Sequence, residues 1–289
     1  MNATDENASL TSASAAPDMK APRKPRRLSI TGWIGVLLVV FWALVSTLGP
    51  WITPYDPGAM VSGDMLGAMS KAHLFGTDFL GRDVLSRILD GTRYTAGLAL
   101  IAAFLACLVG GALGLLTSLC GRWVEEPVSR VVDAIISLPS KMLALVMVSV
   151  FGSSVWLLVI TAVIAYFPGA YRIARSLAMN ITELEYVQAA RSRGEGRLYI
   201  AVVEMLPNMM LPMLTDLGMR FVFIVLLLSG MSFLGLGVQP PAADLGSLVK
   251  ENISGLSQGA PAVIIPALAI GSITIGVNLL LDALGSKRR

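Results

Sequence analysis

The sequence predicts an all-α fold, that of a polytopic membrane protein with six transmembrane helices. Hydrophobic residues make up 55% of its 289 residues, charged residues only 14%, and the mean hydropathy is +0.71, values that ordinary soluble domains do not reach. The chain also contains apolar runs of about the 20 residues that a helix needs to cross the hydrocarbon layer. They lack the alternation of a membrane β-barrel, so each must form a helix, which satisfies its own backbone hydrogen bonds. The six runs are residues 30–48, 95–120, 131–151, 155–171, 211–236 and 262–281.

The positions of Lys and Arg predict the orientation, because short cytoplasmic loops hold the excess of these residues. With the amino terminus inside, fifteen of the 22 cations are cytoplasmic and five are external, while Lys141 and Arg220 lie in or near spans. Both termini and the polar segment between the fourth and fifth spans are therefore expected in the cytoplasm. The five external cations are Lys71, Arg82, Arg87, Arg93 and Lys250.

The chain divides into four parts. Residues 1–28 form a basic cytoplasmic tail with few large apolar groups, which we expect to be disordered. Residues 29–93 hold the first span and an external loop; residues 46–50 offer no small-x-small cleavage site, so we interpret this span as retained rather than as a signal peptide. Residues 94–284 form a five-helix core, and residues 285–289 form a cytoplasmic tail.

The external loop ends in an amphipathic stretch, residues 84–91, whose apolar side chains recur at helical spacing. We expect it to form a helix that lies on the membrane surface and leads into the second span. Before it, Asp78, Arg82 and Asp83 form either a self-contained network of charges or a contact surface for an external partner. His73 is interpreted as a hydrogen-bonded loop residue rather than a metal or peptide ligand.

In the second span, Ala106, Gly110 and Gly114 recur at intervals of four, which predicts that another helix approaches closely on this face. Cys107 and Cys120 fall in the same span, where free thiols behave as small hydrophobes, so redox or metal chemistry is not indicated.

Three charged residues are candidates for a path or gate. Lys141 follows Pro139 inside an apolar run, and an intramembrane cation indicates a functional site by default. The alternative is that its ammonium group reaches the cytoplasmic face while its stem packs against the protein. Asp216 and Arg220 lie four residues apart at the expected cytoplasmic start of the fifth span, a spacing that favours a structural pair over a gate element.

A hydrophilic segment, residues 172–210, separates the fourth and fifth spans. Good helix formers predict a short surface helix that Gly194 ends or bends, and Pro207 is expected to close the second half. Such a segment, which projects into the water phase, is suited to docking on a soluble partner. The candidate coupling residues are Glu185, Gln188, Ala189, Ala190, Arg191, Gly194, Leu206 and Pro207.

Several chemistries are excluded by the residues that the chain lacks. It has no glycine-rich loop ending in Lys-Ser or Lys-Thr, so it does not bind nucleotide itself. One histidine and two membrane thiols do not make a metal cluster or a Ser-His-Asp triad, and we expect neither catalytic residues nor cofactors. The run Met205, Met209, Met210 and Met213 is interpreted as adaptable packing rather than a metal site.

Three separated stretches resemble one family. Gln188-Ala189-Ala190 through Gly194 to Leu206-Pro207 is similar to the cytoplasmic loop with which ABC importer permeases dock on their ATPase subunits. Residues 75–87 and 232–241 resemble, more narrowly, the second permease of the dipeptide, oligopeptide and nickel group. The resemblance covers residues 50–283 and implies the type I permease fold. Glu204, Leu228 and Leu245 depart from the family pattern, which weakens any transfer of substrate identity.

The resemblance implies a bacterial inner (plasma) membrane protein that works in a complex. Its expected partners are a second permease, two ATPase subunits, which bind the ATP, and a periplasmic solute-binding protein that the charges near Asp83 would contact. The expected function is half of a translocation path for peptides or related small solutes, nickel or metal chelates included, without enzyme activity of its own. A secondary transporter would need an acidic coupling residue at the midplane and inverted repeats, and neither is found. A membrane scaffold that recruits an ATPase would leave the external loops unexplained.

Overall fold

The computed structural model describes residues 29–286, so the predicted disorder of the tail and the last three residues lie outside the described part. Within it, helices account for nearly all regular structure, and the only β contacts are two isolated bridges in the loop of residues 52–83. The helices are α1 (Ile30–Leu48), η1 (Gly49–Trp51), α2 (Val84–Cys120), α3 (Arg122–Ile136), α4 (Ser140–Phe151), α5 (Val155–Thr182), α6 (Glu185–Ser192), α7 (Arg197–Tyr199), η2 (Ile200–Met205), α8 (Leu206–Phe233), α9 (Leu245–Glu251), η3 (Ile253–Gln258) and α10 (Pro261–Ser286).

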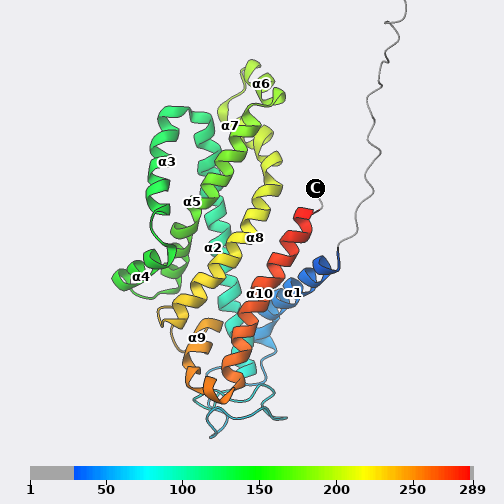
Figure 1. Cartoon of the computed structure of the whole chain (residues 1–289), viewed down its shortest axis with the longest axis vertical. Helices are drawn as coiled ribbons and strands as arrows, with labels where there is room; N and C mark the ends of the chain where they lie inside the picture. Colours follow the sequence, from blue (N-terminus) through cyan, green and yellow to red (C-terminus); the bar gives the residue numbers. More distant parts are fainter. Residues whose placement is uncertain (1–28, 287–289) are drawn as a thin grey trace, which may run out of the picture.

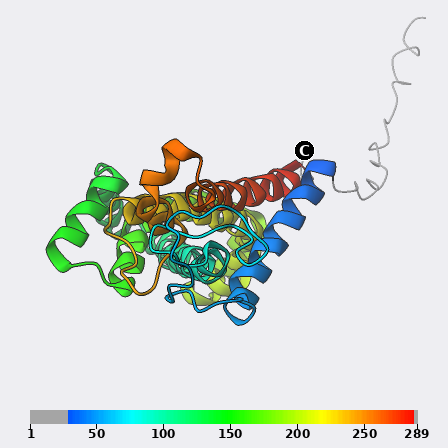
Figure 2. The same ribbon diagram turned by 90° about the horizontal axis from the view of Figure 1, so that it is seen from below.

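The long helices α2, α5, α8 and α10 form an elongated bundle with two distinct ends (Figure 1). The end that carries α6 is called the coupling end below, and the end covered by residues 52–83 and α9 is called the loop end. Seen from the loop end, α1 and the pair α3 and α4 lie on opposite sides of the bundle (Figure 2). The polar segment of residues 172–210, named the coupling segment, and the loop of residues 52–83 therefore lie at opposite ends of the bundle.

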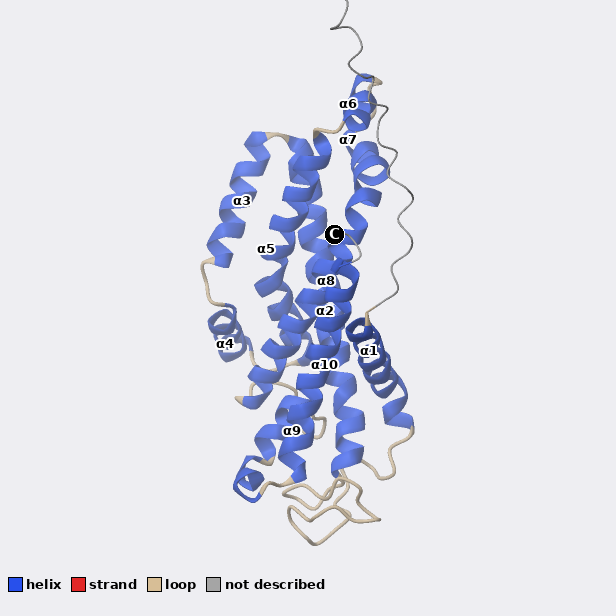
Figure 3. Cartoon of the chain, turned by 45° about the vertical axis from the view of Figure 1, so that its right-hand side comes forward, coloured by secondary structure: helices blue, strands red, loops and turns tan. Residues whose placement is uncertain are grey.

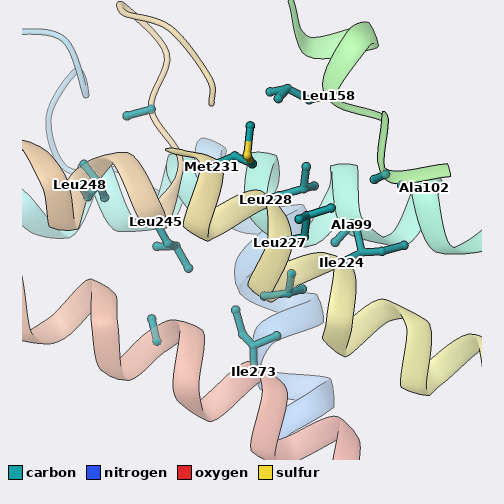
Figure 4. Close-up of a cluster of buried hydrophobic side chains, with 14 of the residues drawn as sticks. Ala99, Ala102, Leu158, Ile224, Leu227, Leu228, Met231, Leu245, Leu248 and Ile273 are labelled. Carbon is teal, nitrogen blue, oxygen red and sulfur yellow. The ribbon is translucent and has the colours of Figure 1, made fainter. Parts of the chain in front are cut away.

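The main core joins α2, α4, α5, α8, α9 and α10 in the half of the molecule nearer the loop end. Small side chains of α2 pack there against larger ones of α8, as Figure 4 shows for Ala99 and Ala102 beside Ile224 and Leu228. Leu245 and Leu248 of α9 and Ile273 of α10 extend the same cluster. Burial of these side chains fixes α9 against the ends of the long helices.

The predicted close approach on Ala106, Gly110 and Gly114 is confirmed, and the approaching helix is α5. A Cβ atom added to Gly114 would lie 2.8 Å from the Cβ of Ala174 and 2.8 Å from the carbonyl oxygen of Tyr171. Ala106 is fully buried. The α2–α5 contact thus depends on positions without a side chain, as expected for helices that pack through small residues.

Within residues 29–286, five helices are long and apolar enough to cross a membrane, or six if one bent pair counts as a single span. The bent pair is α3 and α4, which meet at 84° (Figures 1 and 3). The expectation of one continuous third span over residues 131–151 is therefore wrong. Pro139 explains the break, because it has no N–H to donate and it disfavours the helical conformation at Leu138.

Residues 84–91 do not form a separate helix on the membrane surface. They are the first two turns of α2, which runs for 37 residues. Both sides of this stretch contact the protein: Val84, Ile88 and Arg87 are each 3% exposed, whereas Leu85 and Leu89 are half-buried. The amphipathic pattern predicts the helix correctly, but the stretch packs within the protein instead of lying on the membrane surface.

A Gly114→Leu variant should lower the thermal stability of the purified protein. The added side chain meets backbone and Ala174 of α5, and overpacking of this kind costs about 1–3 kcal/mol or more. The matched control is Gly97→Leu in the same helix, because an added Cβ there meets nothing within 4 Å. Equal melting temperatures of the two variants would contradict the tight α2–α5 contact.

Candidate functional site

The coupling segment is shorter than its sequence suggests, because α5 continues to Thr182 and takes in both Arg172 and Arg175. After two connecting residues the chain forms α6 (Glu185–Ser192), turns back, and enters a continuous helical rod made of α7, η2 and α8. That rod spans Arg197–Phe233, 37 residues. In Figure 1, α6 lies at the tip of the coupling end, above the rod.

Gly194 ends α6 in the left-handed conformation, with φ of +80°. The Gly194 N–H donates to Arg191 O at 2.9 Å and the Glu195 N–H donates to Ala190 O at 3.2 Å, which is the hydrogen-bond pattern of a Schellman motif. The predicted role of Gly194 as the residue that ends the helix is confirmed. An added Cβ would meet nothing within 4 Å, so glycine is needed here for its backbone and not for space.

A second hydrophobic core holds α6 on the bundle. Val187 and Ala190, one turn apart on α6, are fully buried and pack with the α5 residues Ala174 and Ala178. The other buried members of this second core are Leu115, Ile200, Ala201, Met205 and Met209. Met213 packs at its edge, which agrees with adaptable packing by the methionines, whereas Met210 is exposed.

The predicted coupling residues fall into two groups. The side chains of Glu185, Gln188, Ala189 and Arg191 are on the exposed face of α6, and Pro207 is also exposed. Ala190 and Leu206 face the second core instead, so they support the helix from below. The exposed group is the part of the segment that a soluble partner could contact.

A polar link that the residue patterns did not single out ties α6 to α8. Asn208 Nδ2 donates to the Tyr186 hydroxyl at 3.0 Å and to Glu204 O at 2.8 Å. Asn208 is the last residue of the Leu-Pro-Asn stretch, and this stretch is the sequence feature that could have identified it. Tyr186 carried no signal, because an aromatic residue on a short helix is usually a packing residue.

The sequence predicts that Pro207 closes the second half of the segment, but the helix continues through it. It lies in the first turn of α8, directly after η2, a π-helical turn over Ile200–Met205. Pro207 lacks an N–H, and its ring would clash with the carbonyl group four residues earlier in a regular α-helix. A π turn at this point relieves that clash, so the rod passes the proline without a break.

Asp216 and Arg220 form the predicted pair, although not at the end of a span. Arg220 Nε and Nη2 donate to the two carboxylate oxygens of Asp216 at 2.7 and 2.8 Å, and Nη1 donates to Tyr166 O at 2.9 Å. The two residues are 9% and 7% exposed and lie beside Cys107, well inside the bundle. Gly169 leaves room for the guanidinium group, which lies 2.7 Å from where a Cβ would be.

Polar contacts along α3 hold it against α5. The Arg172–Asp133 ion pair measures 2.5 Å, Arg175 pairs with Glu125, and the hydroxyls of Ser129 and Tyr171 lie 2.8 Å apart. Only Val132 of α3 is buried. In contrast, Lys141 at the start of α4 is exposed and has no hydrogen bond or ion pair within residues 29–286, so it stays a candidate path residue or a snorkelling lysine.

The charges of the loop end form a self-contained network. Asp78 Oδ2 accepts from Arg82 Nε at 2.7 Å and from Arg87 Nη1 at 2.8 Å, and both arginines also bind Glu251 of α9. Asp83 caps α2 through Ser86 and lies 3.0 Å from His73 Nδ1, so the interpretation of His73 as a hydrogen-bonded loop residue is confirmed. Direct contact of Asp78, Arg82 or Asp83 with a partner stays a prediction.

Asp244 connects α8 to α9 at the same end. Its carboxylate accepts from the Ser232 hydroxyl at 2.6 Å and from the Ser247 N–H at 2.9 Å, which caps α9. Burial raises the pKa of Asp244 above its usual range, and the hydrogen bonds from Ser232 and Ser247 oppose this rise.

Comparison with known proteins identifies relatives over most of the chain. Residues 110–289 match the model of the family of binding-protein-dependent transport system inner membrane components. A dipeptide transport system permease protein of Haemophilus influenzae is 31% identical over 87% of each chain. A glutathione transport system permease protein of Pectobacterium atrosepticum is 30% identical over 90% of this chain and 85% of its own. A structure of the MetNI methionine ABC transporter in an inward-facing conformation is 16% identical and superposes with a TM-score of 0.55, covering 70% of this chain and 97% of that one, which shows the shared fold.

Removing one member of the Asp216–Arg220 pair should destabilise the protein more than removing both. Asp216→Leu or Arg220→Met alone leaves an unpaired buried charge, which costs about 3–5 kcal/mol, whereas the double variant leaves none. The check is the melting temperature and the uptake rate of the three variants. A gate role predicts a stable double variant without transport; a structural role predicts a stable double variant that transports.

Proposed function

Because the chain belongs to the family of binding-protein-dependent transport system inner membrane components, we propose that it couples ATP-driven motion to the passage of small peptides or related solutes. It is a permease of an ABC importer, a multi-pass inner membrane protein, and not an enzyme; ATP hydrolysis takes place on partner subunits.

The observation that supports the coupling role is that α6 packs on the bundle with one face and exposes the other. One face of this short helix, Val187 and Ala190, is fully buried in the second core, which also contains residues of α2, α5, η2 and α8. The opposite face exposes Glu185, Gln188 and Ala189 to a partner. A force on the exposed face of α6 is transmitted to α2, α5 and α8 together, because closely packed side chains move as a unit.

The surface around α6 supports docking of an ATPase subunit. Leu184, Leu198 and Tyr199 are 46%, 69% and 45% exposed at this end. Apolar side chains grouped at a water-facing tip favour a protein contact. The exposed charges Glu185 and Arg191, at the two ends of α6, would set the orientation of that contact.

The face with α3 and α4 is our candidate for the wall of the path. It combines Lys141 with the half-exposed pair Arg172–Asp133, and α3 is held there by few buried contacts. Charged groups inside a membrane protein commonly mark a solute pathway. A second permease subunit facing this side would complete the channel, and two ATPase subunits would serve the pair.

The names of the relatives guide the choice of solute. Several are named as dipeptide, di/tripeptide or peptide permeases and one as a glutathione permease. We therefore propose short peptides or peptide-like solutes, delivered by a solute-binding protein at the loop end. The loop end would face the periplasm, and the coupling end and both termini would face the cytoplasm.

Ala189→Glu should abolish uptake without disturbing the fold. Ala189 is exposed on α6, so the new carboxylate stays in water in the free permease but is desolvated in a docked interface, at a cost of about 2–5 kcal/mol, or roughly 30-fold to several thousandfold in affinity. Retention of the ATPases in a pull-down and solute-stimulated ATP hydrolysis are the measurements. Ala16→Glu, in the amino-terminal tail, is the control and should behave as wild type. Normal retention and coupling in Ala189→Glu would rule out α6 as the docking element.

Cysteine labelling should report the proposed orientation. In a variant with Cys107 and Cys120 replaced by serine, a cysteine at Ser257 in η3 should react with an impermeant reagent in spheroplasts. A cysteine at Ser12 should react only after the membrane is opened. Labelling of the cysteine at position 12 in intact spheroplasts would contradict the proposed orientation.

A further inference from the structure

A polar pocket lies where the coupling segment meets the ends of α2 and α5. Its volume is about 420 Å³, several times the size of a phosphate group. Segments that are distant in the sequence contribute to its wall: the last turn of α2 with the following Gly121, the last residue of α5, and the stretch from the last turn of α6 through α7 to the start of η2. The lining residues are Ser118, Leu119, Gly121, Thr182, Arg191, Glu195, Arg197 and Ile200.

The pocket holds two arginines that have no ion-pair partner within residues 29–286, Arg191 and Arg197. Neighbouring arginines that do not line it are paired: Arg122 with Glu126 at 2.9 Å, and Arg193 with Glu204 at 3.8 Å. Both side chains are exposed, so both guanidinium groups are accessible to a ligand in the pocket.

One acidic residue, Glu195, opposes the two arginines in the pocket wall. Its partner is Arg193, whose Nε lies 3.9 Å from Glu195 Oε1, at the limit of an ion pair. The charged groups that line the pocket thus carry a net positive charge, which favours an anion. Removal of the Glu195 charge should make that preference stronger.

A phosphate group fits these donors best. The planar guanidinium fork binds phosphate through two parallel hydrogen bonds, and two arginines on converging elements can hold one phosphate from two sides. The hydroxyls of Ser118 and Thr182 line the same space and can rotate toward a ligand, although each now donates to a backbone carbonyl of its own helix.

The depth of the pocket points to the level of the lipid headgroups. The apolar part of α2 begins near Thr95, and a helix needs about 20 residues to cross the hydrocarbon layer, so Ser118 lies roughly 5 Å beyond it. Trp123, two residues after Gly121, is 95% exposed, and exposed tryptophans concentrate at membrane interfaces. In the proposed orientation this is the cytoplasmic leaflet, which contains anionic lipids.

We propose that this pocket binds a phosphate group, carried by an anionic phospholipid or by a soluble phosphate compound, and that the bound anion stiffens the joint between the coupling segment and the bundle. Arg191 and Arg197 lie on opposite sides of the Gly194 turn, where the chain has open space around it. An anion held by both arginines bridges that turn to α2 and α5. The stiffening role rests on the proposed function of α6, whereas binding of the anion does not.

The test uses the complete transporter, purified with its partner subunits and reconstituted in phosphatidylcholine vesicles with or without phosphatidylglycerol. Lipid retention is measured by native mass spectrometry, and coupling by solute-stimulated ATP hydrolysis. A parallel arm supplies inorganic phosphate inside vesicles that contain phosphatidylcholine alone. Arg197→Gln is the main variant, Glu195→Gln the opposite one, and Arg122→Gln the matched control, because Arg122 adjoins the pocket without lining it.

Wild type and Arg122→Gln should retain the anion, Arg197→Gln should bind it about tenfold more weakly, and Glu195→Gln should bind it more tightly. Stimulation by phosphatidylglycerol alone identifies a lipid as the source, and stimulation by inorganic phosphate identifies a soluble one. Equal binding by all four proteins, or none, overturns the site.

Two further outcomes separate this proposal from the coupling role of α6. Loss of the ATPases from Arg197→Gln, with anion binding unchanged, would mean that Arg197 contacts an ATPase directly and would overturn the anion site. Loss of anion binding with full coupling would overturn the stiffening role. The coupling role of α6 itself fails only in the Ala189→Glu pull-down, which does not involve the pocket.

Discussion

The close contact between α2 and α5 is the constraint on which the rest of the structure depends. Gly110 and Gly114 bring the backbones of the two helices together, with no side chain between them. The same stretch of α5 that receives these glycines continues into Ala174 and Ala178, which form the floor of the second core. The position of α6 is therefore set by how α2 and α5 pack. Any movement of α6 must take the two helices with it or separate them.

Buried charged residues form ion pairs both at the loop end and in the middle of the bundle. At the loop end, Asp78 and Glu251 share two arginines and hold the loop of residues 52–83 against α9. In the middle, Asp216 neutralises Arg220 within one helix, and the guanidinium group still reaches a carbonyl of α5. Both arrangements leave no buried charge without a partner, which is the condition for placing charges inside a protein at acceptable cost.

The helical class, the spans, the glycine face of α2 and the turn at Gly194 could be predicted because each depends on local chemistry. The break between α3 and α4 could not. Pro168, Pro212 and Pro266 also lie in membrane helices and are tolerated. Pro139 differs in its surroundings, since α3 buries only Val132 and little packing holds the two halves straight. Hydropathy does not report such packing, so one apolar run was predicted where the chain turns through 84°.

The candidate coupling residues were found as a group, but their division into an exposed and a supporting set depends on the angular position of α6, which eight residues do not define in the sequence. The charges of residues 78–83 offered two alternatives because their partners, Arg87 and Glu251, lie on other elements. Long-range pairing of this kind has no signature at fixed spacing. For the same reason, the sequence does not predict the hydrogen bond between Asn208 and Tyr186.

The π-helical turn over Ile200–Met205 has a consequence for how relatives of this chain can diverge. A π turn accommodates one residue more than an α turn, and one residue corresponds to about 100° of rotation around a helix axis. The side chains of α7 and those of α8 are therefore offset in phase by that amount, although they share one rod. A single-residue insertion or deletion at this point would rotate the coupling segment relative to the membrane-spanning part while leaving both intact. The turn thus provides a place where the orientation of α6 and α7 can change independently of the packing of α8 in the bundle.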